Sequence, residues 1–141
     1  MPTLILESLI KAPVDLCFDL IRDPRIQADP GPKTSGPFEL GQTVTFESSR
    51  FGIRQKLTVK VTEFERPNRF VDDLVDGKFR EFKHVHEFKG RDAGTLIRDT
   101  VTWISSLGPF TRVLDKLVVR RHLRNLITNR NGRLREIAES T

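Results

Sequence analysis

The sequence has no tyrosine, one tryptophan, one methionine and one cysteine among its 141 residues. A lone thiol, Cys17, can form neither an internal disulfide nor a cysteine-rich metal site, so a reducing, cytoplasmic compartment is expected. Cys17 also falls on a predicted apolar helix face and is expected to be an inert buried thiol. The aromatic residues are almost all phenylalanine, whose ring carries no polar group and suits an interior or an apolar pocket.

Long apolar runs are also missing. The opening stretch MPTLILESLIKAP contains Glu7 and Ser8 and is too short to span a bilayer, and no positive segment precedes it. Neither a membrane span nor a signal peptide is therefore expected. There are no internal repeats, and 37% hydrophobic with 30% charged residues is typical of one globular domain, here residues 1–141.

The net charge of +5 comes from the C-terminal region, because residues 107–141 hold eight Lys or Arg against three Asp or Glu. Four of these cations recur every four residues and share one face of a predicted helix: Arg112, Lys116, Arg120 and Arg124. Such a face is usually solvated, and the alternative is an interaction module for nucleic acid or anionic lipid. Nucleic-acid binding is not expected, since no exposed aromatic residues are interleaved with the basic ones.

Hydrophobic periodicity predicts a strand, a short helix, a series of strands and a long helix. Residues 3–11 are rich in Leu and Ile, and Pro13 suits a first helical position. The apolar face of the short helix consists of Val14, Cys17, Phe18 and Ile21. A loop rich in Pro and Gly at 29–41 is followed by strand patterns at 43–50, 57–61, 69–75, 78–89 and 95–105. Tight turns such as Asp76-Gly77 make an antiparallel meander the expected arrangement.

The pattern of residues 107–139 predicts a helix that is long for a domain of this size. Its apolar positions fall into two stripes, one at Phe110–Leu117 and one at Val119–Ile137, which are rotated by more than about 90° around the helix axis. We therefore expect a kink or a short break near Leu117–Val119.

The order of these elements resembles the helix-grip superfamily (SRPBCC), which includes START lipid-transfer domains, birch-pollen allergens and polyketide cyclase/dehydrase-like proteins. The resemblance rests on the stretches Ile10-Lys11-Ala12-Pro13, Glu39-Leu40-Gly41, Pro67-Asn68-Arg69-Phe70 and Gly94-Thr95, the strand 99–103 and the C-terminal run LDKLVVRRHLRNLITNRNGRLREI. The last run is most similar to small bacterial ligand-binding members.

This resemblance implies an α+β fold in which a curved antiparallel sheet of roughly six or seven strands surrounds a long, kinked C-terminal helix. It also implies two short helices after the first strand, and a cavity between sheet and helix that opens near the early loops. Because the superfamily includes carriers, receptors and enzymes, the residues of the site have to decide the function.

The strands 78–89 and 95–105 carry the polar residues of most interest. Side chains alternate between the two faces of a strand, and the more apolar face is expected to point inward. The inward positions predicted in this way are Arg80, Phe82, His84, His86, Phe88, Ile97, Asp99, Val101 and Trp103. Two histidines and an aspartate are thus expected inside the sheet.

Arg130 lies in the middle of the second apolar stripe of the last helix. An unpaired charge in a protein interior costs several kcal/mol, so this side chain requires an anionic partner. Asp99, Asp72 and Asp73 are candidates, as is a ligand carboxylate held by the guanidinium group. A structural ion pair with Asp99 that anchors the helix to the sheet is the favoured interpretation.

The leading functional hypothesis is binding of a small hydrophobic molecule of lipid, polyketide or aromatic type, with a polar or acidic end, by a carrier or sensor without a cofactor. The predicted ligand contacts are Phe82, His84, His86, Phe88, Asp99, Val101, Trp103, Leu123, Ile127 and Arg130. His84 and His86 are also the candidate general acid or base of a cyclase- or dehydratase-like enzyme, or simply polar residues satisfied locally. An enzyme is not favoured, since no tyrosine is there to assist. A metal held by the two histidines and Asp99 is not expected, because three loosely spaced residues are a weak pattern.

Overall fold

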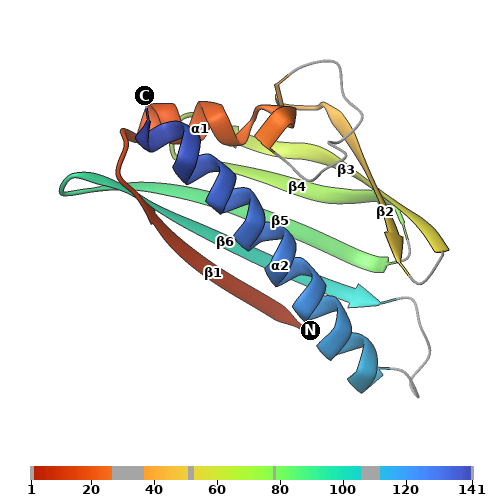
Figure 1. Ribbon diagram of the computed structural model, residues 1–141. Coiled ribbons are helices and arrows are strands. Elements are labelled where there is room, and N and C mark those ends of the chain that lie inside the picture. Colours follow the sequence, from red (N-terminus) through yellow and green to blue (C-terminus); the bar gives the residue numbers. More distant parts are fainter. Residues whose placement is uncertain (1, 27–36, 51–52, 78, 106–111, 141) are drawn as a thin grey trace.

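A computed structural model describes residues 2–26, 37–50, 53–77, 79–105 and 112–140, which form one sheet layer and one helical layer (Figure 1). The elements in chain order are β1 (Thr3–Ile10), α1 (Val14–Ile21), the 3-10 turn η1 (Pro24–Ile26), β2 (Thr43–Arg50), β3 (Ile53–Glu65), β4 (Arg69–Asp76), β5 (Phe79–Arg91), β6 (Gly94–Ser105) and α2 (Arg112–Glu139). The predicted α+β class, curved sheet and long C-terminal helix are confirmed. Most of the loop expected at 29–41 lies outside the described residues.

Of the two short helices expected after β1, only α1 is an α-helix among the described residues, and the segment that follows it is η1. Pro24 explains the difference, because proline disfavours helical geometry at Asp23 and cannot continue the hydrogen bonds of α1. Neither α1 nor α2 combines the length and the apolar composition that a bilayer span requires.

The sheet has six strands in the order β1-β6-β5-β4-β3-β2, and every neighbouring pair is antiparallel. β2 to β6 form the predicted meander, and β1 adds to it beside β6. Residues paired across neighbouring strands point to the same face, so the register defines the concave face. Successive rows across it are Leu6, Asp99, His86 and Phe70, then Leu4, Val101, His84 and Asp72, then Trp103 and Phe82, with Leu74, Val59 and Val44 at the same level.

Arg80 does not join this inward face. The register between β5 and β6 shifts between Phe79 and Glu81, which interrupts the alternation at Arg80 and leaves its side chain exposed. The same irregularity brings the ring of Phe79 to the side of Phe82, at 5.4 Å between ring centroids.

α1 closes one end of the concave face with an aromatic cluster. The ring of Phe18 makes edge-on contacts with Phe64, Phe70 and Phe88, at centroid distances of 5.4, 5.6 and 5.1 Å. Cys17 and Ile21 on the same helix face are fully buried, as the periodicity predicted. Burial raises the pKa of the Cys17 thiol, which agrees with an inert side chain.

α2 crosses the sheet diagonally and lies closest to β1 and α1 (Figure 1). Leu123, Ile127 and Leu134 are buried, as predicted from the second apolar stripe. Leu126 and Ile137 from the same stripe are exposed. The buried face is therefore narrower than the hydrophobic pattern suggested.

The helix runs without interruption from Arg112 to Glu139, so the break expected near Leu117–Val119 is wrong. The first turns of α2 extend past the end of β6 (Figure 1). Leu117 accordingly has 62% of its surface exposed. Of the first stripe, only Leu117 has a described side chain, and its exposure means that the change of direction between the stripes does not require a bend in the helix.

The start of β6 lies tightly against the join between β1 and α1. A Cβ atom at Gly94 would lie 2.3 Å from the carbonyl oxygen of Ile10, so only glycine fits there. The next residue, Thr95, donates a buried hydrogen bond from Oγ1 to the carbonyl oxygen of Ala12 at 2.8 Å. These contacts give a physical reason for the Gly94-Thr95 pair in the sequence.

Two arginines of α2 bond to the outer edge of β1. Arg120 Nη1 donates to the carbonyl oxygen of Thr3 at 2.9 Å, and Arg135 Nη2 donates to that of Leu9 at 3.3 Å. Both carbonyls belong to a border strand, since β1 pairs only with β6 in the described sheet.

Candidate functional site

Four polar side chains meet in the middle of the concave face. Asp99 comes from β6, His84 and His86 come from β5, and Asp72 comes from β4. The register pairs His86 with Asp99 and His84 with Asp72, so the four are direct or diagonal neighbours. Their inward orientation, which the sequence predicted for three of them, follows from the strict alternation along β5 and β6.

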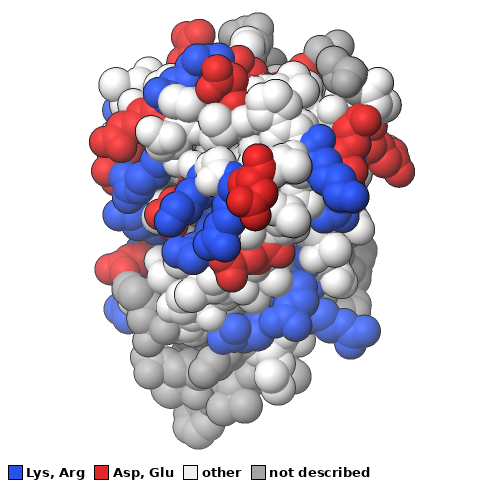
Figure 2. Space-filling model, turned by 90° about the vertical axis from the view of Figure 1, so that its left-hand side faces the viewer, with Lys and Arg blue, Asp and Glu red and all other residues white. Residues whose placement is uncertain are grey.

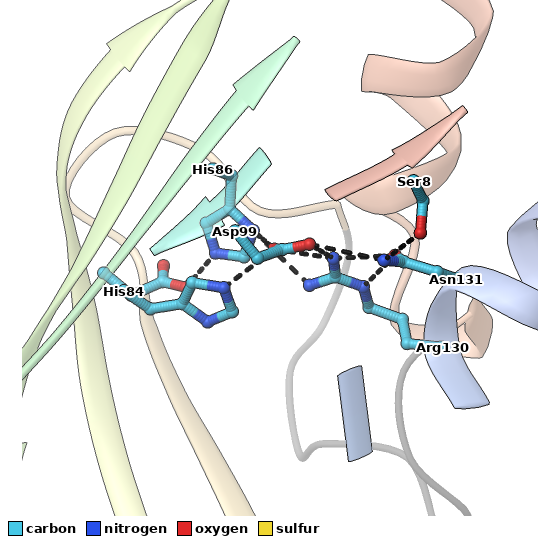
Figure 3. A network of polar contacts seen from close by, with 7 residues as sticks. Ser8, His84, His86, Asp99, Arg130 and Asn131 are labelled. Atoms are coloured by element: carbon cyan, nitrogen blue, oxygen red, sulfur yellow. Dashed lines mark hydrogen bonds and ion pairs between the residues drawn. The ribbon is translucent and has the colours of Figure 1, made fainter. Parts of the chain in front are cut away.

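Arg130 joins α2 to these residues (Figure 3). Its Nη2 atom donates to both carboxylate oxygens of Asp99, each at 2.7 Å. The neighbouring Asn131 accepts from Arg130 Nη2 at 2.9 Å and donates to Ser8 Oγ on β1 at 3.2 Å. The predicted ion pair between Arg130 and Asp99 is confirmed, and the full set Asp72, His84, His86, Asp99, Arg130 and Asn131 is called the polar cluster below.

The two histidines use their ring nitrogens differently. His84 Nε2 lies 2.8 Å from Asp99 Oδ1, whereas His86 Nε2 lies 2.9 Å from Asp72 Oδ2. The other nitrogen of His86, Nδ1, faces Asp99 Oδ1 at 3.4 Å. The rings stack on each other with centroids 3.7 Å apart, and Phe70 stacks on His86 at 4.0 Å.

These surroundings separate the protonation states of the two rings. Burial favours a neutral ring in both. For His86, the hydrogen bonds to Asp72 and Asp99 outweigh burial and raise the pKa above its usual 6.5. For His84, burial and the charge of His86 prevail over Asp99 and lower the pKa to about 4. Burial would raise the pKa of Asp99, but Arg130 and the two imidazoles hold it well below 3.8.

The charges of the polar cluster balance when His86 is protonated, the state that its raised pKa favours. The carboxylates of Asp72 and Asp99 then face the guanidinium of Arg130 and the imidazolium of His86, and His84 is neutral. Arg130 Nη1 lies 3.4 Å from His86 Nδ1. When His86 is neutral, with its proton on Nε2 toward Asp72, Nδ1 accepts this hydrogen bond from Arg130; when His86 is protonated, its Nδ1 proton faces Asp99 instead.

Two buried side-chain atoms in this region have no hydrogen-bond partner among the described residues. They are Asp72 Oδ1, an acceptor, and Trp103 Nε1, a donor. Nδ1 of His84 likewise accepts nothing from the described part of the chain, since the ring's one hydrogen bond is the one from Nε2. Buried polar atoms are nearly always paired, so unpaired ones indicate where an interior can take a polar partner.

Solved structures of several proteins share this architecture over nearly the whole chain. TTHA0849 from Thermus thermophilus is 19% identical, with a TM-score of 0.75 over 99% of this chain and 100% of its own. Ginseng major latex-like protein 151 from Panax ginseng is 15% identical, with a TM-score of 0.64 over 96% of both chains. DynU16, from the dynemicin biosynthetic locus, is 18% identical with a TM-score of 0.68, over 99% of this chain and 48% of its own. No protein-family model and no curated protein matches the sequence.

The chain has the helix-grip fold. This confirms the fold that the sequence resemblance implied. In this helix-grip chain, the predicted ligand contacts all lie on the concave face or on the buried side of α2, but most are closely packed. Phe82, His86, Phe88, Asp99, Val101, Trp103, Leu123, Ile127 and Arg130 are buried. His84 alone among these ten is partly accessible, with 12% of its side chain exposed. Their role in ligand binding stays a prediction.

Among the described residues, the polar cluster and apolar side chains fill the space beneath the second half of α2 at the level of Arg130, where a cavity was expected. The described residues do line a pocket of about 380 Å³ further along β4 and β5. Pairing of these strands ends at Asp73 and Lys83. The pocket forms where they separate, and its lining residues are Asp73, Leu74, Arg80, Glu81, Phe82, Lys83 and Thr102.

A metal-binding arrangement is also present that the sequence did not predict in this form. Asp72, His84 and His86 each offer a ligand atom, and these atoms lie within 4.8 Å of one another. From the sequence, the third possible ligand beside the two histidines was Asp99 and not Asp72. A divalent ion there would have to displace the proton between His86 and Asp72 and would add positive charge near Arg130. The charge balance therefore favours the hydrogen-bonded cluster over a metal centre.

Among the basic residues of α2 whose side chains are described, several serve the fold, whereas the side chains of Arg112 and Lys116 lie outside the described residues. Besides Arg120 and Arg135 on the β1 edge, Arg133 donates from Nε to the carbonyl oxygen of Ile26 at 2.8 Å. On the face shown in Figure 2, Lys and Arg side chains are interspersed with Asp and Glu and form no continuous basic patch. The arrangement gives the nucleic-acid alternative no specific support.

Sequence reasoning missed Asn131, a member of the polar cluster, and Ser8, which accepts a hydrogen bond from Asn131. Asn131 lies four residues after the buried Ile127, so the helical period could have placed it on the same side of α2. Ser8 lies on the inward face of β1, where alternation with Leu4 and Leu6 places it. Small polar residues at inward positions are thus the signal that was available.

Proposed function

We propose that this chain binds a small hydrophobic molecule in the hollow of the helix-grip fold, as a carrier or sensor in the cytoplasm. The observation that carries the proposal is the uneven burial of the concave face. The closed half, beneath α1 and the second half of α2, includes Phe70, Phe88 and Ile97, which are fully or almost fully buried. The open half consists of Phe46, Leu57, Leu74 and Phe79, which are only partly buried.

The open half is apolar and lies beside the polar cluster. Phe46 pairs with Leu57 across β2 and β3, and Leu74 follows Asp72 by two residues on the same face of β4. In Figure 1, β2 and the distal ends of β3 to β5 lie to one side of α2 rather than beneath it. An apolar ligand that removed about 200 Å² of apolar surface from water there would gain roughly 5 kcal/mol, before the entropic cost of binding.

Direct binding measurements test this proposal. A fluorescent neutral probe such as 1-aminoanthracene is titrated into the protein, and fatty acids, fatty alcohols, sterols and aromatic polyketides are then added as competitors. We expect at least one class to displace the probe and to raise the melting temperature. Replacing Leu74 by Lys should weaken binding, because it puts a charge into the open half, whereas Val75→Lys on the exposed face of β4 is the matched control. Failure of every class to bind would contradict the proposal.

A cyclase- or dehydratase-like enzyme is the second candidate, and the pair Asp99–His84 favours it. A carboxylate that fixes one nitrogen of a neutral imidazole leaves the other free to take a proton, which is the arrangement of a general base. The likeness to DynU16 from a biosynthetic locus agrees with this candidate. Turnover of a bound polyketide that His84→Gln abolishes without loss of binding would support the enzyme over the carrier.

A further inference from the structure

We propose, on the basis of the ligand-binding function above, that the ligand carries a neutral hydrogen-bond donor, a hydroxyl or phenol group. This group donates a hydrogen bond to His84 Nδ1. The sequence had suggested an acidic end held by Arg130. The polar cluster instead leaves an acceptor, His84 Nδ1, facing the open half, and the unpaired donor in this region, Trp103 Nε1, is fully buried.

The tautomer of His84 follows from its one hydrogen bond. Asp99 has no proton to donate, because Arg130 holds it as a carboxylate, so the proton between Asp99 Oδ1 and His84 Nε2 belongs to the ring. A second proton on Nδ1 would add a third cation to a cluster that already has Arg130 and His86 facing two carboxylates. Nδ1 is therefore the lone-pair nitrogen of a neutral ring.

His84 is also the member of the cluster that a ligand can reach. Its side chain is 12% exposed, whereas those of Asp99, His86 and Arg130 are 0, 3 and 4% exposed. On β5 the inward neighbour of His84 is Phe82, and Leu74 is inward on β4; these two line the pocket from the concave side, whereas Asp73, Lys83 and Thr102 line it from the opposite face. A ligand lying on these apolar side chains would have its polar end at His84.

A carboxylate end does not fit this position. The guanidinium of Arg130 is buried and already bonds to both oxygens of Asp99. Asp72 Oδ1, on the strand position paired with His84, is a second acceptor without a partner among the described residues. A ligand carboxylate would face two acceptors, and burying it without a compensating donor is costly.

A cationic end fits no better, because the polar cluster is neutral as it stands and an added cation would lie near Arg130 and His86. A hydroxyl group meets the requirement without any change in charge. It donates to His84 Nδ1, and the net gain from one such hydrogen bond in a buried site corresponds to roughly tenfold in affinity.

A matched ligand series tests the inference on the wild-type protein. We would measure the dissociation constants of 1-decanol, decyl methyl ether, decanoate and decylamine, and of 2-naphthol, 2-methoxynaphthalene and 2-naphthoate, by displacement of 1-aminoanthracene. The alcohol and the phenol are expected to bind about tenfold more tightly than their methyl ethers and carboxylates. Zn²⁺ is titrated in parallel, with melting temperature as the readout.

Variants then assign the preference to His84. His84→Phe keeps a ring but has no acceptor, so the advantage of alcohol over ether should fall to less than about threefold, while His84→Gln retains an acceptor oxygen and should preserve part of it. Lys89→Ala, on the opposite face of β5 and outside the pocket lining, should leave the ratio unchanged. Equal binding of ether and alcohol, preference for the acid, or stabilisation by Zn²⁺ without any preference for alcohol would overturn the inference. Of these, the first two would leave ligand binding itself intact, whereas binding of no probe at all would overturn both proposals.

Discussion

Phenylalanine lines both halves of the concave face, but among the described residues it is only in the closed half that a helix covers it. Phe70 and Phe88 pack around Phe18 of α1, whereas Phe46 and Phe79 in the open half are only partly buried. Residue type alone therefore does not decide whether a position is core or pocket wall. What decides it is whether a second layer reaches that part of the sheet.

The polar cluster lies at the boundary between the two halves, and its two histidines differ accordingly. His86 is stacked between Phe70 and His84 and bonds to carboxylates from two strands. His84 bonds to one carboxylate and is partly exposed. The same residue type, two positions apart on one strand, is thus favoured as a cation at His86 and as a neutral acceptor at His84.

The largest effect is expected from Asp99→Asn, which removes the charge that holds Arg130 in the interior. Breaking a buried pair in this way typically costs about 3–5 kcal/mol, because the remaining charge is left uncompensated. Urea denaturation measures the loss of unfolding free energy. Glu7→Gln is the control, since its partner Arg98 is exposed and such surface pairs contribute only about 0–1 kcal/mol. Similar losses for the two variants would contradict a role for Asp99 in anchoring α2.

The difference between the halves predicts unequal costs for the same substitution. Phe18→Ala should lower the unfolding free energy by about 3–5 kcal/mol, because it empties the centre of the aromatic cluster. Phe79→Ala in the open half should cost about 1–2 kcal/mol, because its ring already contacts solvent on one side. Both values come from the same denaturation experiment, and equal costs would show that the two halves are packed alike.

The two histidines should make stability depend on pH in opposite directions. His84 has a lowered pKa, so its contribution is complete above the unfolded value of about 6.5 and is lost as the pH falls toward about 4, by up to roughly 3 kcal/mol. His86 has a raised pKa, so its contribution is present below about 6.5 and is lost as the pH rises through its folded value.

The combined contribution of His84 and His86 to the stability of the fold should therefore be greatest near pH 6.5. Melting temperatures of the wild type and of His84→Phe from pH 4 to 9 check this. Between pH 6.5 and about pH 4, the melting temperature of the variant is expected to fall much less than that of the wild type. Below that range, protonation of Asp99 destabilises both proteins, because its pKa is lowered in the folded state. An unchanged acid-side slope in the variant would rule out His84 as its source.

A smaller effect is expected at the edge of the closed half. Gly94→Ala would put a Cβ atom 2.3 Å from the carbonyl oxygen of Ile10, so the backbone has to move. Overpacking of this kind typically costs about 1–3 kcal/mol. Gly90→Ala is the matched control, since nothing lies within 4 Å of a Cβ atom built there. Thermal unfolding of the two variants should differ by several degrees, and equal melting temperatures would mean that β6 and β1 can separate freely.

The alternation along β5 and β6 was enough to predict that His84, His86 and Asp99 point inward, and the helical period placed Arg130 opposite them. Each of these is a local property of one element. The hydrogen bond between His86 and Asp72 depends on the register between β4 and β5. The different protonation of the two histidines depends on charged groups from β4, β6 and α2. Neither property can be predicted from one strand or helix alone.

Errors in the prediction have the same origin. The break in α2 was inferred from two apolar stripes, on the assumption that both pack on the sheet, yet Leu117 is exposed because the helix outreaches the strands. Arg80 was placed inside because a shift in register between β5 and β6 leaves no trace in the pattern of one strand. The position of the open half likewise depends on the path of α2 across the sheet.

The hydrogen bonds from Arg120 and Arg135 to β1 also affect how copies of the chain meet in solution. A border strand with free carbonyl groups is a template on which another chain can extend the sheet, and such growth leads to aggregation. Here the oxygens of Thr3 and Leu9 are already taken by guanidinium groups from the same molecule. An incoming strand would have to displace both cations, so we expect α2 to hinder the pairing of a second chain at these two positions of β1.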